Sequence, residues 1–415
     1  MHHARFQRNT FMGNKAPVTV EDQALHVISP HDDNNRAAFG ELMVAQIAPK
    51  AAWRFDYGTT PNTRLYTAAT ANGGTTTISQ SRLLLQTSAN AAGSAQLQTN
   101  RRLRYLPGLG GLVRFTAVFD APANNNTQIV GLGDANDGFF FGYLGTAFGI
   151  VRRRAGVDSF VDRSAWNGID VDITPQLGNV YQIRYQWLGY GYIRFYILDP
   201  DEPSRGYALV HTIHYPNTAA VTSVLNPTLP LFAQVANSGN ASNIQLYTPS
   251  AMGGQEGQPE PPFNPLDVAN SYNALATFAD TNNNHLLTIH NKATFSGVAN
   301  RVPVSVRSIT LARSSAGATL TTLRLYRNAT FGGALVYADI DTNNSPVEAS
   351  ATTTTVTGGT VERTYVLGNS TTTLQIDFEV GELMLGPNDT LTIAVQDNIA
   401  SGTVVSGVVN WFEEF

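Results

Sequence analysis

The sequence predicts an all-β protein in which two antiparallel β-sandwich or jelly-roll domains follow an extended N-terminal arm. Three observations favour this fold class: apolar and polar residues alternate with a period of two, segments rich in Gly, Asn, Asp and Pro separate these runs, and helical patterns are nearly absent. A single hydrophobic core rarely organises more than ~250–300 residues. A chain of 415 residues is therefore expected to form at least two domains.

The N-terminal arm is predicted to cover residues 1–50, which mix polar, Asn-rich and short apolar stretches. Its one helical candidate, residues 39–46, fits a strand nearly as well. Residues 51–249 are predicted to form the first, lectin-like sandwich. Within this range Val113 and Phe115 alternate with Arg114 and Thr116, which gives the strand one apolar and one polar face.

A linker is predicted at residues 250–265, where the sequence SAMGGQEGQPEPPFNP contains too much Gly and Pro for a strand or a helix. Residues 266–415 then contain a second series of short alternating segments, which suits a jelly roll or a related sandwich. The chain closes on WFEEF, and these aromatic residues predict that the last strand is ordered within its sheet.

The composition indicates a protein that packs against other subunits. Charged residues make up 14% of the chain, against ~25% in typical soluble domains. Each charge in an interface must be desolvated or paired, so uncharged polar surfaces suit assembly, and we expect a homo-oligomer. A net charge of −5 disfavours nucleic acid as a partner.

Further classes are excluded by what the sequence lacks. Without cysteine there is no disulfide framework, thiolate metal site or cysteine nucleophile. The N-terminus has no continuous apolar segment of the kind a signal peptide needs, and no apolar run approaches ~18 residues. We therefore expect no membrane span.

Two arginine clusters stand out in this charge-poor chain, in which lysine occurs only three times. We predict that they bridge subunits by binding carboxylates or backbone carbonyls, because the guanidinium group suits such contacts better than an ammonium. The alternative is an ordinary solvated face. The clusters are Arg101, Arg102 and Arg104, and Arg152, Arg153 and Arg154.

The segment from residue 39 to about residue 249 resembles a family of virion-associated proteins of tailed phages and large DNA viruses that carry a concanavalin-A-like jelly roll. The resemblance rests on the order and spacing of four blocks, at residues 39–46, 101–119, 127–153 and 178–197. It implies a virion location and a non-enzymatic structural role at the capsid surface, in a fibre or spike, or in the tail. The implied partners are the protein itself and other virion proteins.

Two alternatives to this role remain open. The first is a host-attachment adhesin that binds surface glycans through aromatic and Asn-rich loops, and the second is a jelly-roll glycan hydrolase. The block at 127–153 bears on both, because it contains several aromatic residues separated by glycines. They are Phe139, Phe140, Phe141, Tyr143 and Phe148. We interpret these rings as sandwich core, with an aromatic surface that stacks on glycans as the alternative.

Two acidic motifs could serve glycan hydrolysis. On a strand, Asp377 and Glu379 would share one face, with Glu382 close behind, as a glycosidase would require of neighbouring carboxylates. This string resembles the acidic strand signature of jelly-roll β-glucanases, but its first two acids are interchanged. Asp170 and Asp172 have the same spacing. For both motifs the favoured interpretation is a solvent-facing polar strand, so we predict no enzyme and no catalytic residues.

A calcium site is the one cofactor that the sequence raises. Asp134, Asn136 and Asp137 could offer hard oxygen ligands from the GDANDG turn. The segment is not an EF-hand loop, because Gly145 stands where the bidentate Glu should fall. The same residues are also those that a hairpin turn selects, and no other cofactor is expected.

Overall fold

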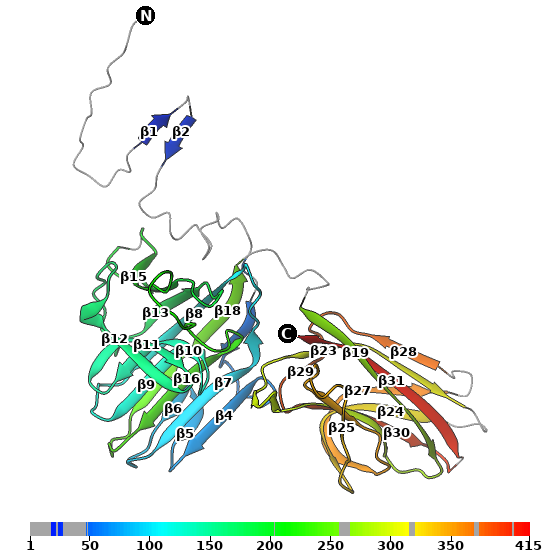
Figure 1. The fold of residues 1–415 in the computed structure, drawn as a ribbon. Helices are drawn as coiled ribbons and strands as arrows, with labels where there is room; N and C mark the ends of the chain where they lie inside the picture. Colours follow the sequence, from blue (N-terminus) through cyan, green and yellow to red (C-terminus); the bar gives the residue numbers. More distant parts are fainter. Residues whose placement is uncertain are drawn as a thin grey trace, which may run out of the picture. The chain divides into compact units, whose positions relative to one another are not determined.

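The computed structural model describes residues 18–21, 24–27, 47, 49–202, 204–256, 266–314, 320–368, 373–400 and 402–415. The chain divides into two units, Met1–Pro259 and Glu260–Phe415, and both consist of antiparallel strands (Figure 1). The one helical turn in the described ranges is the 3-10 helix Arg163–Ala165. The predicted all-β fold class is therefore confirmed. None of the described residues belongs to a helix with the length and apolarity needed to span a membrane.

The first unit is a sandwich of two sheets. The seven-stranded sheet runs in the order β12-β11-β10-β9-β16-β7-β4. Its strands are β4 (Tyr66–Ala71), β7 (Ser94–Leu103), β9 (Asn126–Gly133), β10 (Gly138–Leu144), β11 (Ala147–Arg154), β12 (Val157–Asp162) and β16 (Leu229–Asn237).

The nine-stranded sheet has the main order β15-β14-β13-β8-β17-β6-β5, and β18 joins it by pairing with β8 and β3. Its strands are β3 (Pro49–Arg54), β5 (Thr75–Ser79), β6 (Arg82–Gln86), β8 (Gly110–Phe119), β13 (Asn179–Tyr185), β14 (Ile193–Leu198), β15 (Tyr207–Ile213), β17 (Gln245–Thr248) and β18 (Ser250–Glu256). A separate antiparallel pair precedes the sandwich, formed by β1 (Val18–Glu21) and β2 (Ala24–Val27).

The period of two in β8 and β13 decides which side chains enter the sandwich. Phe115 and Tyr181 are buried in the core, where their rings stack with centroids 5.4 Å apart. Because successive strand residues point to opposite faces, Arg114, Gln182 and Arg184 lie on the other face of this sheet. The alternation thus produces both the core and a polar outer face.

The glycine-rich block at 127–153 forms β9, β10 and β11, and its aromatic residues are buried as predicted. Phe139 and Phe141 enter the main core, whereas Phe140 belongs to a smaller cluster on the other face of the sheet. A Cβ atom on Gly133 would lie 2.4 Å from the Phe140 ring. This close approach explains why glycine accompanies the rings.

Two predicted boundaries need correction. Residues 250–256 form β18 and pair with two neighbouring strands, so the predicted linker cannot begin at residue 250. A Cβ atom added at Gly253 would lie 3.6 Å from the Leu231 side chain, an ordinary contact distance, so this strand position does not require glycine. The arm ends before residue 50, since β3 already belongs to the sandwich. The rest of the predicted linker, 257–265, and the helical candidate at 39–46 lie outside the described residues.

The second unit contains two larger sheets and the short pair β21–β22. The five-stranded sheet has β19-β31-β23-β28 with β29 beside β23, and the six-stranded sheet has the order β25-β26-β20-β30-β24-β27. The strands are β19 (Asp267–Phe278), β20 (Asn284–Asn291), β21 (Thr294–Phe295), β22 (Val298–Ala299), β23 (Val304–Arg313), β24 (Thr321–Phe331), β25 (Ala338–Asp339), β26 (Val347–Ser350), β27 (Val356–Leu367), β28 (Thr373–Asp377), β29 (Met384–Leu385), β30 (Thr390–Asp397) and β31 (Thr403–Glu414).

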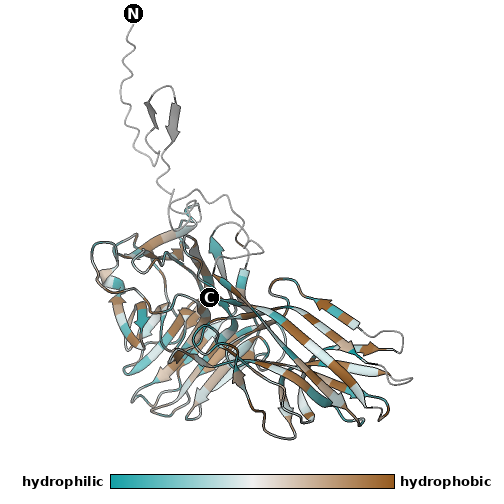
Figure 2. Ribbon diagram, turned by 45° about the vertical axis from the view of Figure 1, so that its right-hand side comes forward, coloured by the Kyte–Doolittle hydropathy of each residue, from teal (hydrophilic) through white to brown (hydrophobic). Residues whose placement is uncertain are grey.

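Hydrophobic and hydrophilic residues alternate along many of these strands (Figure 2). The C-terminal strand β31 pairs with β19 on one side and with β23 on the other, and Trp411 is buried in the core of the unit. The last strand is therefore ordered, as the aromatic residues near the C-terminus predict.

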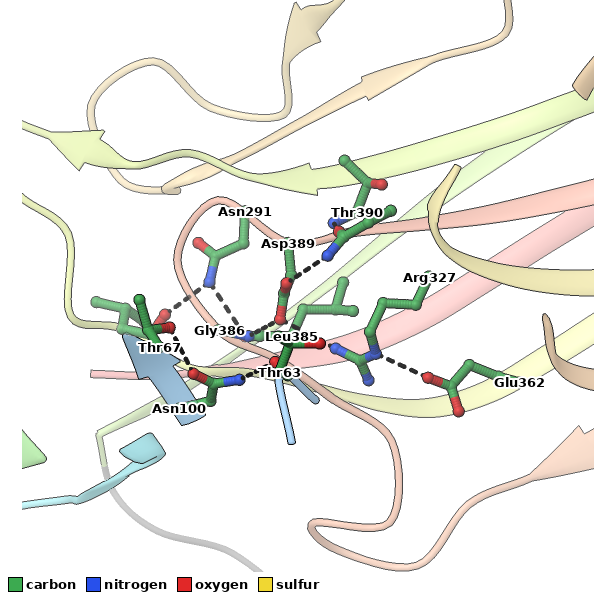
Figure 3. Close-up of polar contacts among 12 residues, drawn as sticks. Thr63, Thr67, Asn100, Asn291, Arg327, Glu362, Leu385, Gly386, Asp389 and Thr390 are labelled. Carbon is green, nitrogen blue, oxygen red and sulfur yellow. Dashed lines mark hydrogen bonds and ion pairs between the residues drawn. The ribbon is translucent and has the colours of Figure 1, made fainter. Parts of the chain in front are cut away.

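A polar network fastens the turn before β30 to its neighbours (Figure 3). Arg327 donates to Glu362 at 2.8 Å and to Asp389 at 3.0 Å. The second Asp389 oxygen accepts from Asn328 at 3.0 Å, and the backbone N–H of Thr390 donates back to Asn328 at 2.8 Å. Each charged group in this network has a partner, so we assign it a structural role.

His285 gives the second unit an acid-sensitive contact. Its Nδ1 donates to the Thr352 carbonyl at 2.6 Å, and its Nε2 lies 2.8 Å from the Thr288 hydroxyl and accepts from it. Burial is the main cause that lowers the pKa of His285 below its ordinary value of 6.5. As the pH falls below ~6.5, the unfolded histidine binds a proton while the folded one does not. The free energy of unfolding should therefore fall with pH, by at most ~1.4 kcal/mol per pH unit from this group.

Urea unfolding at pH 7.5 and 5.5 would measure this effect, and the difference between the two pH values should shrink in His285→Gln. The exposed His214 gives the matched control, His214→Gln. An equal acid-induced loss in His285→Gln and in the wild type would contradict the assignment.

Candidate functional site

The connection between β12 and β13 carries a cavity of the first unit. This segment passes from the seven-stranded to the nine-stranded sheet. Its cavity has a volume of about 610 Å³, within the ~300–1,000 Å³ range of small-molecule sites. The lining, which we call the Trp166 pocket, comprises Asp162, Arg163, Ser164, Trp166, Gly168, Ile169 and Asp170.

Trp166 is half-buried and rests against the sandwich core. Its ring centroid lies 6.0 Å from that of Phe141 and 6.2 Å from that of Phe148. Both phenylalanines are buried core residues, so the core side of the indole is held in place by their rings. A fixed indole offers a ligand a flat apolar surface at low entropic cost.

Asp162 ends β12 and caps the 3-10 helix that follows. Its Oδ1 accepts hydrogen bonds from the backbone N–H of Ser164 at 2.9 Å and from the Ser164 hydroxyl at 2.6 Å. These two bonds lower the pKa of Asp162 below its ordinary value. The pocket therefore contains a carboxylate that is ionised at neutral pH.

Arg163 organises the rest of the loop. It donates to the carbonyl oxygens of Val171 at 2.7 Å and Ile173 at 3.1 Å. Its Nη2 also lies 3.8 Å from Asp170 Oδ1 and 3.8 Å from Asp172 Oδ1. One guanidinium therefore lies beside both carboxylates.

The sequence singled out Asp170 and Asp172 but placed them wrongly on a strand. In the structure they lie in the loop, highly exposed, and Asp170 lines the pocket. Exposed and buried residues still alternate from Asp170 to Ile173, so both aspartates face outward, and the Arg163 guanidinium lies 3.8 Å from each of them. Asp162, Arg163 and Trp166 were missed, although a tryptophan inside the polar segment DRSAWNGIDVDI was a usable signal.

The second acidic motif does not form a shared strand face. Strand β28 ends at Asp377, and a turn follows in which Glu382 donates its N–H to the Glu379 carbonyl. The Glu382 carboxylate accepts from Arg363 at 2.6 Å and from the Glu379 N–H at 3.1 Å. The predicted alternation of Asp377 and Glu379 fails because the strand stops between them.

The GDANDG turn uses its side chains to hold local backbone. Asp134 Oδ1 accepts from the N–H groups of Asn136 at 2.8 Å and Asp137 at 3.0 Å. Asp137 Oδ1 accepts from the N–H of Leu225 at 2.9 Å. Within the described ranges no three His, Asp or Glu side chains gather as a metal site would need. These contacts favour the turn interpretation, and calcium binding stays a prediction.

The arginines of the second cluster find partners within the first unit. Arg153 forms an ion pair with Asp158 at 2.7 Å and covers the Phe140 ring at 5.4 Å. Arg152 donates to the Ser223 carbonyl at 3.2 Å, and Arg154 donates to the Thr222 carbonyl at 2.9 Å. The guanidinium groups of these arginines thus hold β12 and the loop before β16. A role in contacts between subunits stays a prediction.

The three arginines of the first cluster differ in their exposure to solvent. Arg101 is exposed, Arg102 is half-buried and Arg104 is buried. Contact with another subunit stays a prediction for this cluster as well.

Comparison with known proteins gives a likeness of fold. No family model and no curated protein matches the chain. Among solved structures, a glycosyl hydrolase family protein from Mycobacterium fortuitum is 15% identical with a TM-score of 0.36, and the match covers 50% of this chain and 99% of that chain. A putative beta-glucanase from Mycobacterium abscessus is 13% identical with a TM-score of 0.37, over 50% and 100% of the two chains.

A third similar structure is an immunostimulatory antigen and pseudo beta-1,3-glucanase from Mycobacterium tuberculosis. It is 11% identical with a TM-score of 0.35, over 49% of this chain and 97% of that chain. At these identities the likeness concerns the fold alone, so any activity of this chain has to be argued from its own residues.

These comparisons correct the functional prediction. The sequence resemblance implied a virion-associated family and a non-enzymatic structural component of a virus particle, in a capsid, fibre or tail. The three solved structures named above are instead a glycosyl hydrolase family protein and two glucanase-like proteins, and none of the three is viral. The predictions of a virion structural role and of no enzyme are therefore wrong. What the sequence predicted correctly is the architecture, a protein built of antiparallel β-sandwich domains.

Proposed function

We propose that the first unit binds and hydrolyses a glycan in the Trp166 pocket. One observation carries the proposal: a single cavity brings together a fixed, half-exposed indole, the carboxylates of Asp162 and Asp170, and the guanidinium of Arg163. Carbohydrate sites combine apolar stacking with several polar groups that receive hydroxyls, and this pocket offers both.

The charges of the pocket favour a neutral glycan. Asp162 and Asp170 line it with Arg163, and the carboxylate of Asp172 lies beside the same guanidinium. Three acids against one base repel the carboxylates or sulfates of acidic sugars. Neutral hydroxyls can donate to the aspartates while the sugar ring lies against Trp166.

Hydrolysis of a glycosidic bond uses two carboxyl groups with different tasks. One of these tasks needs an ionised carboxylate. We assign it to Asp162, because the hydrogen bonds from Ser164 keep this side chain charged. It attacks the anomeric carbon or activates the water that does so. The protonated form of Asp170 gives its proton to the leaving oxygen. Water supplies hydroxide to the anomeric carbon and its remaining proton returns to a carboxylate, so one water molecule is added across the broken bond.

The indole is tested by Trp166→Ala, which should weaken the binding of neutral polysaccharide ~10- to 100-fold, equivalent to ~1.4–2.8 kcal/mol. Affinity electrophoresis in gels containing β-glucan, mannan or xylan measures this as loss of retardation. The matched control is Tyr57→Ala, because Tyr57 is 81% exposed and lies outside the pocket. Trp166→Phe keeps a ring against Phe141 and Phe148 and guards against a general folding defect. Equal retardation of the wild type and Trp166→Ala would refute the site.

A further inference from the structure

We propose that a second pocket of the first unit, on the outer face of the nine-stranded sheet, binds the anionic group of a ligand. This Arg114 pocket has a volume of about 180 Å³, and the residues that line it include Arg114, Gln182, Arg184, Arg205 and Tyr207. It shares no residue with the Trp166 pocket. The inference is therefore independent of the proposed glycan hydrolysis.

Two of the three arginines in this pocket are neutralised by acidic partners. Arg184 Nε lies 2.5 Å from Glu256 Oε1, and both side chains are buried. Arg205 forms an ion pair with Asp199 at 2.6 Å and a second one with Glu202. Each of these two guanidinium groups therefore faces at least one carboxylate.

Arg114 differs from the other two because the described part of the chain gives it no carboxylate partner. It is half-buried in the middle of β8. Its Nε donates to Gln182 Oε1 at 2.8 Å, and its guanidinium lies over the Tyr207 ring at 5.0 Å. A partly buried charge without a counter-ion is unfavourable, so the Arg114 guanidinium favours an incoming anion.

The contacts of Arg114 also present it in a suitable orientation. Gln182 holds the Nε edge and Tyr207 supports one face, so the two terminal nitrogens are the donors that remain for a ligand. Terminal guanidinium nitrogens bind carboxylate, sulfate and phosphate oxygens in pairs. The register of the sheet places Arg114 directly opposite Gln182, which makes this arrangement part of the strand pairing.

The size of the pocket limits what it can hold. Its volume lies below the ~300 Å³ lower end of whole-ligand sites, so it accommodates one charged group rather than a complete oligosaccharide. That group can belong to an acidic sugar, or it can be a free inorganic oxyanion. Both kinds of ligand present the same anionic chemistry. The choice of ligand in the binding experiment distinguishes them.

Isothermal titration calorimetry tests the proposal with sodium sulfate, sodium phosphate and glucuronic acid at constant ionic strength, with glucose as the neutral control. The wild-type protein should bind at least one of the anions saturably. Arg114→Gln should weaken this binding at least tenfold, and Arg114→Lys should retain part of it because the charge remains. The matched control is Arg194→Gln, since Arg194 also stacks on a tyrosine but does not line the pocket.

The pattern of anions that bind distinguishes the two sources of the anionic group. Binding of glucuronic acid alone identifies an acidic sugar as the source of the anion, and binding of sulfate or phosphate alone identifies a free oxyanion. Gln182→Leu provides a second variant, which leaves Arg114 in place but unfixed and should weaken binding about threefold or more. The proposal is overturned if the wild type binds none of the anions, or if Arg114→Gln binds them as tightly as Arg194→Gln does.

Discussion

Replacement of Asp170 by asparagine is expected to lower kcat/KM for glycan cleavage by ~10²–10⁴-fold, the usual contribution of a general acid. An amide of nearly the same shape cannot give a proton to the leaving oxygen. Because the Asp170 side chain is 94% exposed, the fold should be unaffected. KM should change little, since the stacking surface of Trp166 is intact.

The release of reducing ends from a neutral polysaccharide measures this effect. Asp377→Asn serves as the matched control, because Asp377 belongs to the other acidic motif and lies at the end of an exposed strand in the second unit. Asp377→Asn should keep full activity. Retention of full activity in Asp170→Asn, or an equal loss in both variants, would show that the catalytic carboxyl lies elsewhere.

The largest stability effect is expected for Glu256→Ala, which should lower the free energy of unfolding of the first unit by ~3–5 kcal/mol. The Glu256 carboxylate and the Arg184 guanidinium have side-chain exposures of 0% and 1%. Truncation would remove the buried carboxylate that faces this guanidinium, which is far less favourable than replacing both partners together. The two residues come from β18 and β13, which flank β8.

Urea unfolding of the single and double variants tests this account. Replacement of both partners, Arg184→Met with Glu256→Leu, should recover most of the loss because no charge remains buried. A loss below ~1 kcal/mol in Glu256→Ala, the size of a typical surface pair, would contradict the assignment.

The sheets of the first unit could be predicted because the information is local. Alternation in β8 separates Phe115 from Arg114 within the strand itself, so one core face and one polar face follow from the sequence alone. Strand β18 was missed for the complementary reason. Its two glycines weaken the local strand signal, and pairing with β3 and β8 on both sides overrides that weakness.

The candidate sites could not be predicted in the same way, because each joins residues that are distant in the chain or held by backbone contacts. The Arg114 pocket needs the register of β8 against β13 and the approach of Tyr207 from β15. In the loop after β12, the bonds from Arg163 to the carbonyls of Val171 and Ile173 set the positions of the aspartates. A period of two gives the shared outward placement of Asp170 and Asp172, but it carries no information about these contacts.

The error in functional class has a physical explanation as well. Three of the four blocks that suggested virion-associated proteins, residues 101–119, 127–153 and 178–197, include strands β8 to β11, β13 and β14. Residues in these strands are selected for packing and tight turns, so a likeness there reports the jelly roll and not its use. The loop that forms the Trp166 pocket contributes to none of these blocks.

The most direct test of glycan hydrolysis at the Trp166 pocket is product analysis after incubation of the full-length protein with neutral polysaccharides in water enriched in oxygen-18. The wild-type protein should release oligosaccharide fragments that carry one labelled oxygen per cleaved bond, and Asp162→Asn and Asp170→Asn should not form them. The absence of labelled fragments from every polysaccharide that the protein retards in affinity gels would contradict it.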